Sequence, residues 1–174
     1  MKKRLTRFPG KMKGSFRGKY PPCSLKYALW GAISGVLSIL AILGITKLAG
    51  HPLLIGSFGA SAVLLFGAHD SPLAQPRNLV GGHLVSASIA VAIVALFGSG
   101  SLAMATAVGL SIFLMYFTRT VHPPGGATAL IGVQGHAGYG FLLFPVLAGV
   151  LILLAVALFT NNIVHHRQYP KNWI

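Results

Sequence analysis

Two short stretches of the chain combine histidine, proline, glycine and small hydroxyl residues in an order that could bind an anion. One reads His122-Pro123-Pro124-Gly125-Gly126-Ala127-Thr128, and the other reads Ser57-Phe58-Gly59-Ala60-Ser61. Proline and glycine ahead of an apolar run predict an extended lead into a helix N-terminus, where free N–H groups and the dipole favour negative charge. Thr128 and Ser61 could add hydroxyl hydrogen bonds. Close packing between helices is the alternative explanation for most of these glycines.

Two arginines border these stretches. Arg77 lies in a compact polar loop with Gln75 and Asn78, and Arg119 follows an apolar run. An ionisable residue at a membrane site is a functional hypothesis by default, with anchoring at the interface as the alternative. Arg77 is predicted to supply charge to the anion site, whereas Arg119 fits either role.

Asp70 is the only acidic residue in the chain. It could pair with Arg77, carry a coupling proton, or cap a turn, and pairing and capping together are favoured. A single carboxylate excludes paired-carboxylate hydrolysis, two-metal sites and Mg²⁺-phosphate chemistry, so no enzyme is expected.

The seven histidines lack the tight spacing, or the Cys and carboxylate partners, that metal ligands usually have. Neither a metal site nor a cofactor is therefore expected. His83 lies inside an apolar run and suggests a hydrogen bond to neighbouring backbone. A titrating role in proton-linked transport is open for His83 or His122.

The elements that must position these residues are long apolar runs. Hydrophobic residues make up 54% of the 174 residues and charged residues 9%, whereas soluble domains carry about 25% charged residues. Uncharged runs of about 20 residues cross the hydrocarbon as helices. The predicted fold is an all-α membrane protein with four full transmembrane helices plus two short broken or re-entrant helical segments. The full spans are predicted at residues 27–46, 79–98, 102–118 and 141–160.

The chain also reads as two similar halves, each with a long span, a His-Pro pair, a short Gly-rich segment, a loop and a long span. A shift of 67 residues aligns Gly59–Leu64 with Gly126–Ile131, and Gly82 with Gly149. Paired Gly-interrupted segments are typical of transport sites, although likeness of composition alone is the alternative.

The number of membrane crossings depends on the two short segments. If both are re-entrant, the chain crosses four times and its halves are parallel. If both cross, there are six crossings, the halves are inverted, and Arg77 and Arg119 are cytoplasmic. The positive-inside rule favours six, but the short length of the segments favours four, which is the preferred prediction.

The basic residues are concentrated at the start of the chain, where nine of the 14 Lys and Arg precede residue 27. Clustered cations also suit nucleic acid, but the positive-inside rule explains the apolar remainder, so no nucleic-acid partner is expected. We expect a basic cytoplasmic tail at 1–26, a transmembrane domain at 27–161 and a short basic C-terminal tail at 162–174. The expected location is a bacterial inner membrane, with both termini cytoplasmic.

Three motifs carry a family resemblance. His122–Ala129 resembles the signature of the HPP family of integral membrane proteins, and Gly59–Ala62 and Ser71–Asn78, with Gly81-Gly82-His83, resemble its other motifs. The resemblance implies four membrane-spanning helices and a transporter. Plant chloroplast and cyanobacterial members of that family are associated with nitrite transport.

The expected function is therefore a transporter or channel for a small inorganic anion, with nitrite as the leading candidate. Four spans are few for a pathway within one chain, so a homo-oligomer in the lipid bilayer is expected. The alternative is a non-transporting membrane subunit that packs against a partner protein. The predicted substrate-binding residues are Ser57, Gly59, Ser61, Arg77, His122, Gly125, Gly126 and Thr128.

Overall fold

The structure is a computed structural model that describes residues 24–50 and 55–174. The first His-Pro pair and nearly all of the basic N-terminal tail lie outside these ranges. Within them the chain forms helices joined by short connections. The elements are α3 (Leu25–Ala49), α4 (Gly56–Ala62), the π-helix η1 (Val63–Gly67), the 3₁₀ turn η2 (Pro72–Ala74), α5 (Pro76–Phe97), α6 (Ser101–Phe117), α7 (Pro123–Gln134), the π-helical η3 (Leu142–Leu147) and α8 (Ala148–Ile163).

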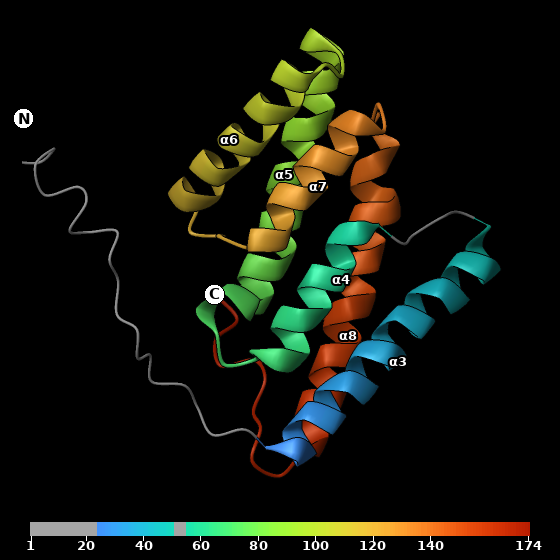
Figure 1. Cartoon of the computed structure of the whole chain (residues 1–174), viewed down its shortest axis with the longest axis vertical. Coiled ribbons are helices and arrows are strands. Elements are labelled where there is room, and N and C mark those ends of the chain that lie inside the picture. Colours follow the sequence, from blue (N-terminus) through green and yellow to red (C-terminus); the bar gives the residue numbers. More distant parts are fainter. Residues whose placement is uncertain (1–23, 51–54) are drawn as a thin grey trace, which may run out of the picture.

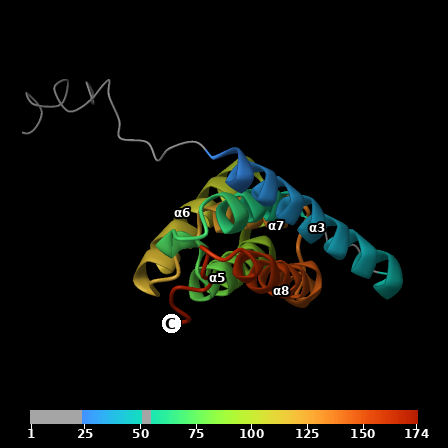
Figure 2. The same cartoon turned by 90° about the horizontal axis from the view of Figure 1, so that it is seen from below.

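The helices form a bundle with a four-helix centre and two flanking helices. α4, α5, α7 and α8 lie in the middle, while α3 and α6 lie on opposite outer sides (Figures 1 and 2). α3 packs on α8 and η1, and α6 packs on α5 and α7. α3 buries only Ser34, Ser38 and Ile42, and its large apolar side chains face outward. Small and polar residues inside with large apolar residues outside are expected where lipid surrounds the bundle.

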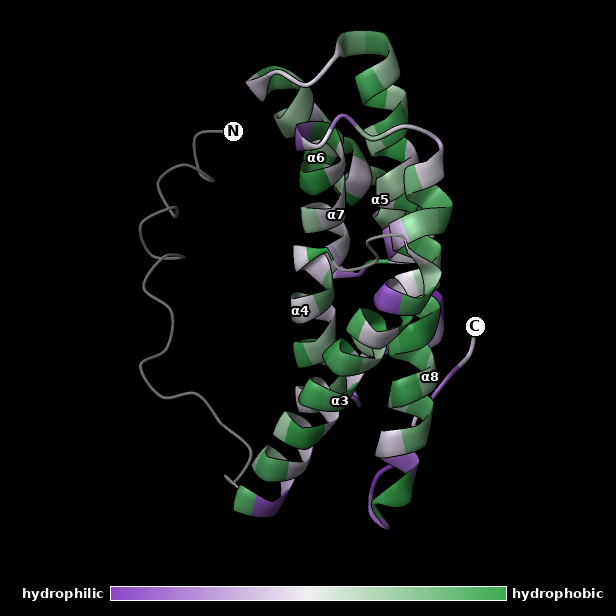
Figure 3. Ribbon diagram, turned by 90° about the vertical axis from the view of Figure 1, so that its right-hand side faces the viewer, coloured by the Kyte–Doolittle hydropathy of each residue, from purple (hydrophilic) through white to green (hydrophobic). Residues whose placement is uncertain are grey.

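The described residues contain three helical segments that are long and apolar enough to cross a membrane. They are Leu25–Ala49, Pro76–Phe97 and Leu142–Ile163. The remaining predicted span is α6, a shorter apolar helix of 17 residues. The helices are mostly hydrophobic along their length (Figure 3). The chain is therefore an all-helical integral membrane protein.

Each helix from α3 to α8 runs in the opposite direction to the helix before it in the chain, and this includes the short helices α4 and α7 (Figure 1). Arg77 at the start of α5 donates to the Thr118 carbonyl after α6, whereas Ser99 and His136 meet at the other end of the bundle. α4–η1 and α7 therefore run between the two ends and do not turn back, which corrects the prediction of re-entrant segments. About 12 helical residues cover about 18 Å, less than the hydrocarbon thickness of about 30 Å.

Proline decides where two helices begin or bend. α7 begins at Pro123, earlier than predicted, and His122 before it is extended (φ −137°, ψ 104°). Proline suits the first helical position because it has no N–H to leave unpaired. The predicted continuous last span is interrupted at Phe144 (φ −130°, ψ 118°) ahead of Pro145, because proline disfavours a helical residue before it. α4 passes directly into the π-helix η1.

The C-terminal residues fold back onto the end of the bundle. Tyr169 is buried, and its hydroxyl donates to the Ala74 carbonyl at 2.8 Å. The backbone N–H of Lys171 donates to the Gln75 side chain at 2.7 Å. This segment therefore holds the connection between η1 and α5 in place.

Glycines let the central elements approach closely. A Cβ added at Gly82 would lie 2.5 Å from the His122 Cβ and 2.9 Å from the Thr120 carbonyl oxygen. A Cβ added at Gly149 would meet the buried Phe58 ring. Such distances do not occur between real atoms, so any larger residue requires the neighbouring element to move.

We expect Gly82→Ala to destabilise the protein by about 1–3 kcal/mol, because the added methyl group collides with backbone and overpacks the core. Gly109→Ala is the matched control, since nothing lies within 4 Å of its added Cβ, and it should be neutral or stabilising by up to about 1 kcal/mol. Melting temperatures in detergent would measure both. Equal melting temperatures for the two variants would contradict this packing.

Candidate functional site

Five polar side chains from separate parts of the chain meet in the centre of the bundle. They are Ser57 and Ser61 on α4, His83 on α5, His122 immediately before α7, and Thr128 on α7, and each has 0% exposure. We call these five residues the polar cluster. Polar groups buried among apolar helices are costly unless they are hydrogen-bonded. The cluster must therefore satisfy its own donors and acceptors.

Ser61 lies between two imidazoles at the middle of the polar cluster. Its Oγ is 2.8 Å from His83 Nε2 and 2.9 Å from His122 Nε2. The ring centroids of the two histidines are 4.9 Å apart. His122 Nδ1 lies 2.8 Å from the Leu73 carbonyl oxygen. A carbonyl can only accept, so Nδ1 of His122 carries a hydrogen.

The hydrogen bonds continue from His83 to the start of α4. His83 Nδ1 lies 2.7 Å from Thr128 Oγ1. Thr128 in turn donates to Ser57 Oγ at 2.8 Å. The ring of Phe58 meets His83 edge-on, with centroids 5.6 Å apart. One unbroken path therefore joins α4, α5, α7 and the connection before α5.

The antiparallel packing of α4 against α7 produces this arrangement. Ser57 and Ser61 are four residues apart and so share one face of a helix. Ser57 at the start of α4 meets Thr128, while Ser61 near its end meets His122 at the start of α7. The two helix N-termini therefore do not face one another, which corrects the expectation of a pocket between them.

The predicted glycines divide into two kinds. A Cβ at Gly125 would lie 2.9 Å from the Gly82 carbonyl oxygen and 3.1 Å from Met115 Sδ, so Gly125 permits the contact between α7 and α5. Gly126 and Gly59 have nothing within 4 Å of an added Cβ. Neither of these two makes the close contacts that Gly125 makes, and their role in binding stays a prediction.

Arg77 lies outside the polar cluster, at the end of the bundle. It is exposed, and its guanidinium donates to the Thr118 carbonyl at 3.0 Å. Six residues separate it from His83, about 9 Å along a helix. Arg77, Asn78 and Arg119 help to line a surface hollow of about 190 Å³. The charges of Arg77 and Arg119 thus lie at the surface and are not in contact with the polar cluster.

Asp70 pairs with a residue other than the one predicted. Its carboxylate lies 3.2 Å from Lys171 Nζ and 3.4 Å from His69 Nε2. Burial lowers the pKa of His69, despite the nearby carboxylate, so His69 is neutral at pH 7. Asp70 thus forms an ion pair with Lys171, and of the three predicted roles the structure does not show the pairing with Arg77.

His83 is the residue that sequence reasoning placed least well. Its predicted partner was neighbouring backbone, but both ring nitrogens bond to side chains of other helices. The only signal in the sequence was its position after Gly81-Gly82, which allows close approach of another element. In the described ranges no three His, Cys, Asp or Glu side chains come together as metal ligands.

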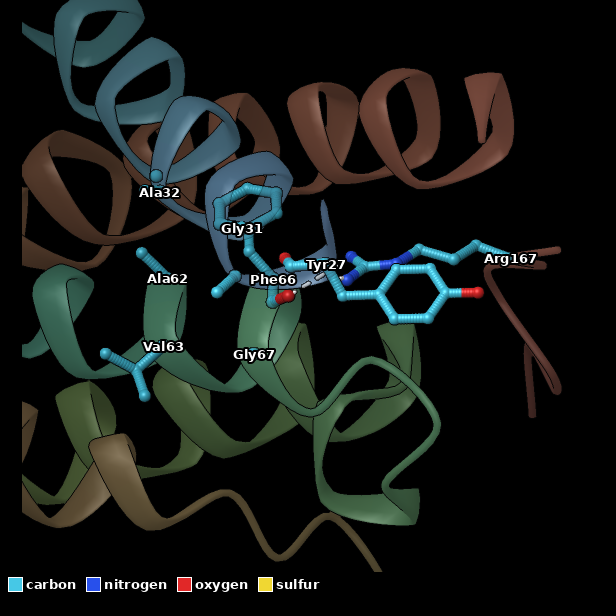
Figure 4. A pocket seen from close by; sticks show the side chains of 10 residues that line it. Tyr27, Gly31, Ala32, Ala62, Val63, Phe66, Gly67 and Arg167 are labelled. Atoms are coloured by element: carbon cyan, nitrogen blue, oxygen red, sulfur yellow. Dashed lines mark hydrogen bonds between the residues drawn. The ribbon is translucent and has the colours of Figure 1, made fainter. Parts of the chain in front are cut away.

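The grooves on the surface lie apart from the polar cluster. One, of about 470 Å³, runs between α3 and α4–η1 and ends at Arg167 (Figure 4). Its walls are mainly small and apolar, and none of the five cluster residues lines it. Arg167 lies over the Tyr27 ring, 5.3 Å from its centroid, and donates to the Phe66 carbonyl at 3.2 Å. This arginine therefore connects α3, η1 and the C-terminal segment.

Comparisons with known proteins assign the helical bundle to one protein family. The family described as "HPP, transmembrane region" matches residues 20–170. Two curated proteins of Dictyostelium discoideum, both named as transmembrane proteins, are similar to the chain. One is 44% identical over 94% of this chain and the other is 51% identical over 69%. The chain spans 62% and 41% of the lengths of these relatives. No solved structure matches.

We expect Ser61→Ala to destabilise the protein by about 1–3 kcal/mol, because two buried imidazole nitrogens lose their partner. Ser111→Ala is the matched control. Ser111 is also fully buried, but it bonds only to the Ala107 carbonyl of its own helix, which keeps its backbone hydrogen bond. Melting temperature in detergent is the measurement, and equal losses in the two variants would argue against a cooperative cluster.

Proposed function

The chain belongs to the HPP family of integral membrane proteins, and from this premise we propose that it moves a small inorganic anion across the membrane. Nitrite is the leading substrate. The observation that carries the proposal is the polar cluster, which places hydroxyl and imidazole groups at the centre of an apolar bundle. Such groups can donate hydrogen bonds, and none of them is acidic.

The polar cluster suits a small anion by size and chemistry. Its side chains contact one another directly at 2.7 to 2.9 Å, so a bound ion must replace some of these hydrogen bonds. Nitrite has two acceptor oxygens and could take the hydrogens that Thr128 and Ser61 now give to protein partners. A larger or more strongly hydrated anion would lose more hydration than two such donors replace.

Arg77 and Arg119 give the proposed path a positive entrance. Both are exposed at the same end of the bundle and line one hollow. A hollow lined with one sign of charge raises the local concentration of ions of the opposite sign. In this role Arg77 attracts the anion to the path, and the buried groups bind it.

The arrangement of close contacts supports a chain made of two inverted halves. Gly82 on α5 packs against Gly125 on α7, and Gly149 on α8 packs against Phe58 on α4. A shift of 67 residues relates Gly82 to Gly149 and Phe58 to Gly125, so the two contacts are equivalent. Inverted halves with short central helices are a common plan in transporters, with the substrate between them.

The charge distribution supports cytoplasmic termini. Arg77, Arg119, Arg167 and Lys171 all lie at the end of the bundle where α3 begins and α8 ends. The positive-inside rule assigns that end to the cytoplasm. With six crossings both termini lie there, and a bacterial inner membrane remains the proposed location.

A non-transporting subunit is the second candidate, and one observation favours it. Within the described residues, the polar side-chain atoms of the cluster all have partners in the chain, as in a network that serves only to hold helices together. A homo-oligomer in the lipid bilayer is proposed in either case.

We expect Thr128→Val to lower nitrite flux into proteoliposomes by about tenfold or more, because the variant keeps the shape but removes a buried hydroxyl, worth about 1–3 kcal/mol. Thr106→Val, at an exposed position of α6, is the control and should retain wild-type flux. Wild-type flux in Thr128→Val would remove the cluster from the path. Absence of flux with nitrite, nitrate, formate and chloride would favour the subunit.

We expect Arg77→Ala to raise the nitrite concentration needed for half-maximal flux by up to about tenfold, with little change in maximal flux. The effect should shrink at high ionic strength, because salt screens exposed charges. Lys47→Ala, an exposed cation in the last turn of α3 at the opposite end, serves as control. A lower maximal flux with an unchanged half-saturation would place Arg77 in the translocation step instead.

A further inference from the structure

The geometry of the polar cluster limits how many hydrogens its groups can carry. Each hydroxyl has one hydrogen to donate, and each neutral imidazole has one N–H. At one end, His122 Nδ1 must donate, because its partner is the Leu73 carbonyl. At the other end, Thr128 and Ser57 form a hydroxyl–hydroxyl hydrogen bond, and in the first arrangement Thr128 is the donor.

With Thr128 donating to Ser57, one arrangement follows for the groups between these two ends. Because the Thr128 hydrogen is already used, His83 Nδ1 must donate to Thr128 Oγ1. Ser61 has one hydrogen and two imidazole neighbours, so it can donate to only one Nε2, and the other Nε2 must donate to it. The two imidazoles together then carry three N–H hydrogens. A neutral pair carries two, so this arrangement holds one additional proton.

A rotation of one hydroxyl converts the cluster to its neutral form. If Thr128 turns its hydrogen toward His83 Nδ1, then His83 Nε2 donates to Ser61 and Ser61 donates to His122 Nε2. Ser57 then donates to Thr128 in place of accepting from it, so every contact in the cluster is kept and the imidazoles carry two N–H hydrogens. The same heavy-atom positions therefore accept two states that differ by one proton. In the protonated state the charge can pass between the two histidines through Ser61.

The protonated state has no counter-ion within the chain. The hydrogen-bond and ring partners of the two histidines include Ser61 and Phe58 of α4, Thr128 of α7 and the Leu73 carbonyl, and none of these is charged. Among the residues that the structure describes, the titratable side chain that faces each histidine is the other histidine. Asp70, the only acidic residue in the sequence, is 65% exposed and paired with Lys171. A buried charge without a partner is strongly disfavoured.

We infer that the His83–Ser61–His122 unit takes up one proton together with one monovalent anion, so that the two cross the membrane as a neutral pair. This inference rests on the proposed function and specifies its energy source. The anion supplies the counter-charge that the protein lacks. The proton supplies the donor that the anion needs in an interior without fixed cations. Neither charge then has to be buried alone.

The test measures nitrite uptake by proteoliposomes of the full chain under two separate driving forces. With the membrane potential held at zero by valinomycin and equal potassium, an acid exterior should drive accumulation of about tenfold per pH unit, since one proton accompanies each anion. An imposed potential without a pH gradient should drive no accumulation. Protein-free liposomes measure leakage of nitrous acid through lipid, which must be subtracted.

The outcomes separate the inference from the proposed function. Nitrite flux that follows the potential and ignores the pH gradient would overturn proton coupling while leaving anion transport intact. No flux of nitrite under either gradient would count against the function itself.

A binding measurement tests the proton without transport. In ¹⁵N-histidine-labelled protein, ring-nitrogen spectra should show three N–H nitrogens on His83 and His122 with nitrite bound and two without it. Single His83→Asn and His122→Asn variants assign the signals. Two N–H nitrogens in both conditions would overturn the inference, even if every variant failed in transport.

Discussion

Water is absent from the hydrocarbon core of a bilayer, and this constraint governs the structure. A polar side chain buried there must find its partner inside the protein. Ser61 meets this requirement by bonding to His83 and His122 together, and Thr128 does so by joining His83 to Ser57. Because each bond needs a distance near 2.8 Å, the cluster also sets how α4, α5 and α7 lie against one another.

The bonds in the cluster are possible only because the helices approach closely. Gly82 and Gly125 face one another where α5 meets the start of α7, and no side chain separates the two backbones. Membrane helices associate through such close packing, since lipid provides no hydrophobic drive between them. The glycines of the family motifs therefore act on function indirectly, by bringing the imidazole of His122 within reach of Ser61.

Fixed charge is excluded from the interior and collected at one end. Arg77 and Arg119 line a hollow at the surface, and the single carboxylate is tied to Lys171 outside the bundle. The groups at the centre that can change their charge are consequently the histidines, since each imidazole is neutral or positively charged depending on one proton.

The sequence by itself determined that this protein lies in a lipid bilayer, and it determined where most of the helices run. Long uncharged runs predicted helices, because hydropathy is a local property, and three of the described helical segments are long and apolar enough to cross a membrane. The motifs also marked Ser57, Ser61, His122 and Thr128 as site residues. Only the tertiary structure decided which groups touch. The partners of Ser61 are 22 and 61 residues away, and no periodicity encodes contacts over such separations. For the same reason Arg77, beside the motifs in sequence, lies outside the cluster, while His83 lies within it.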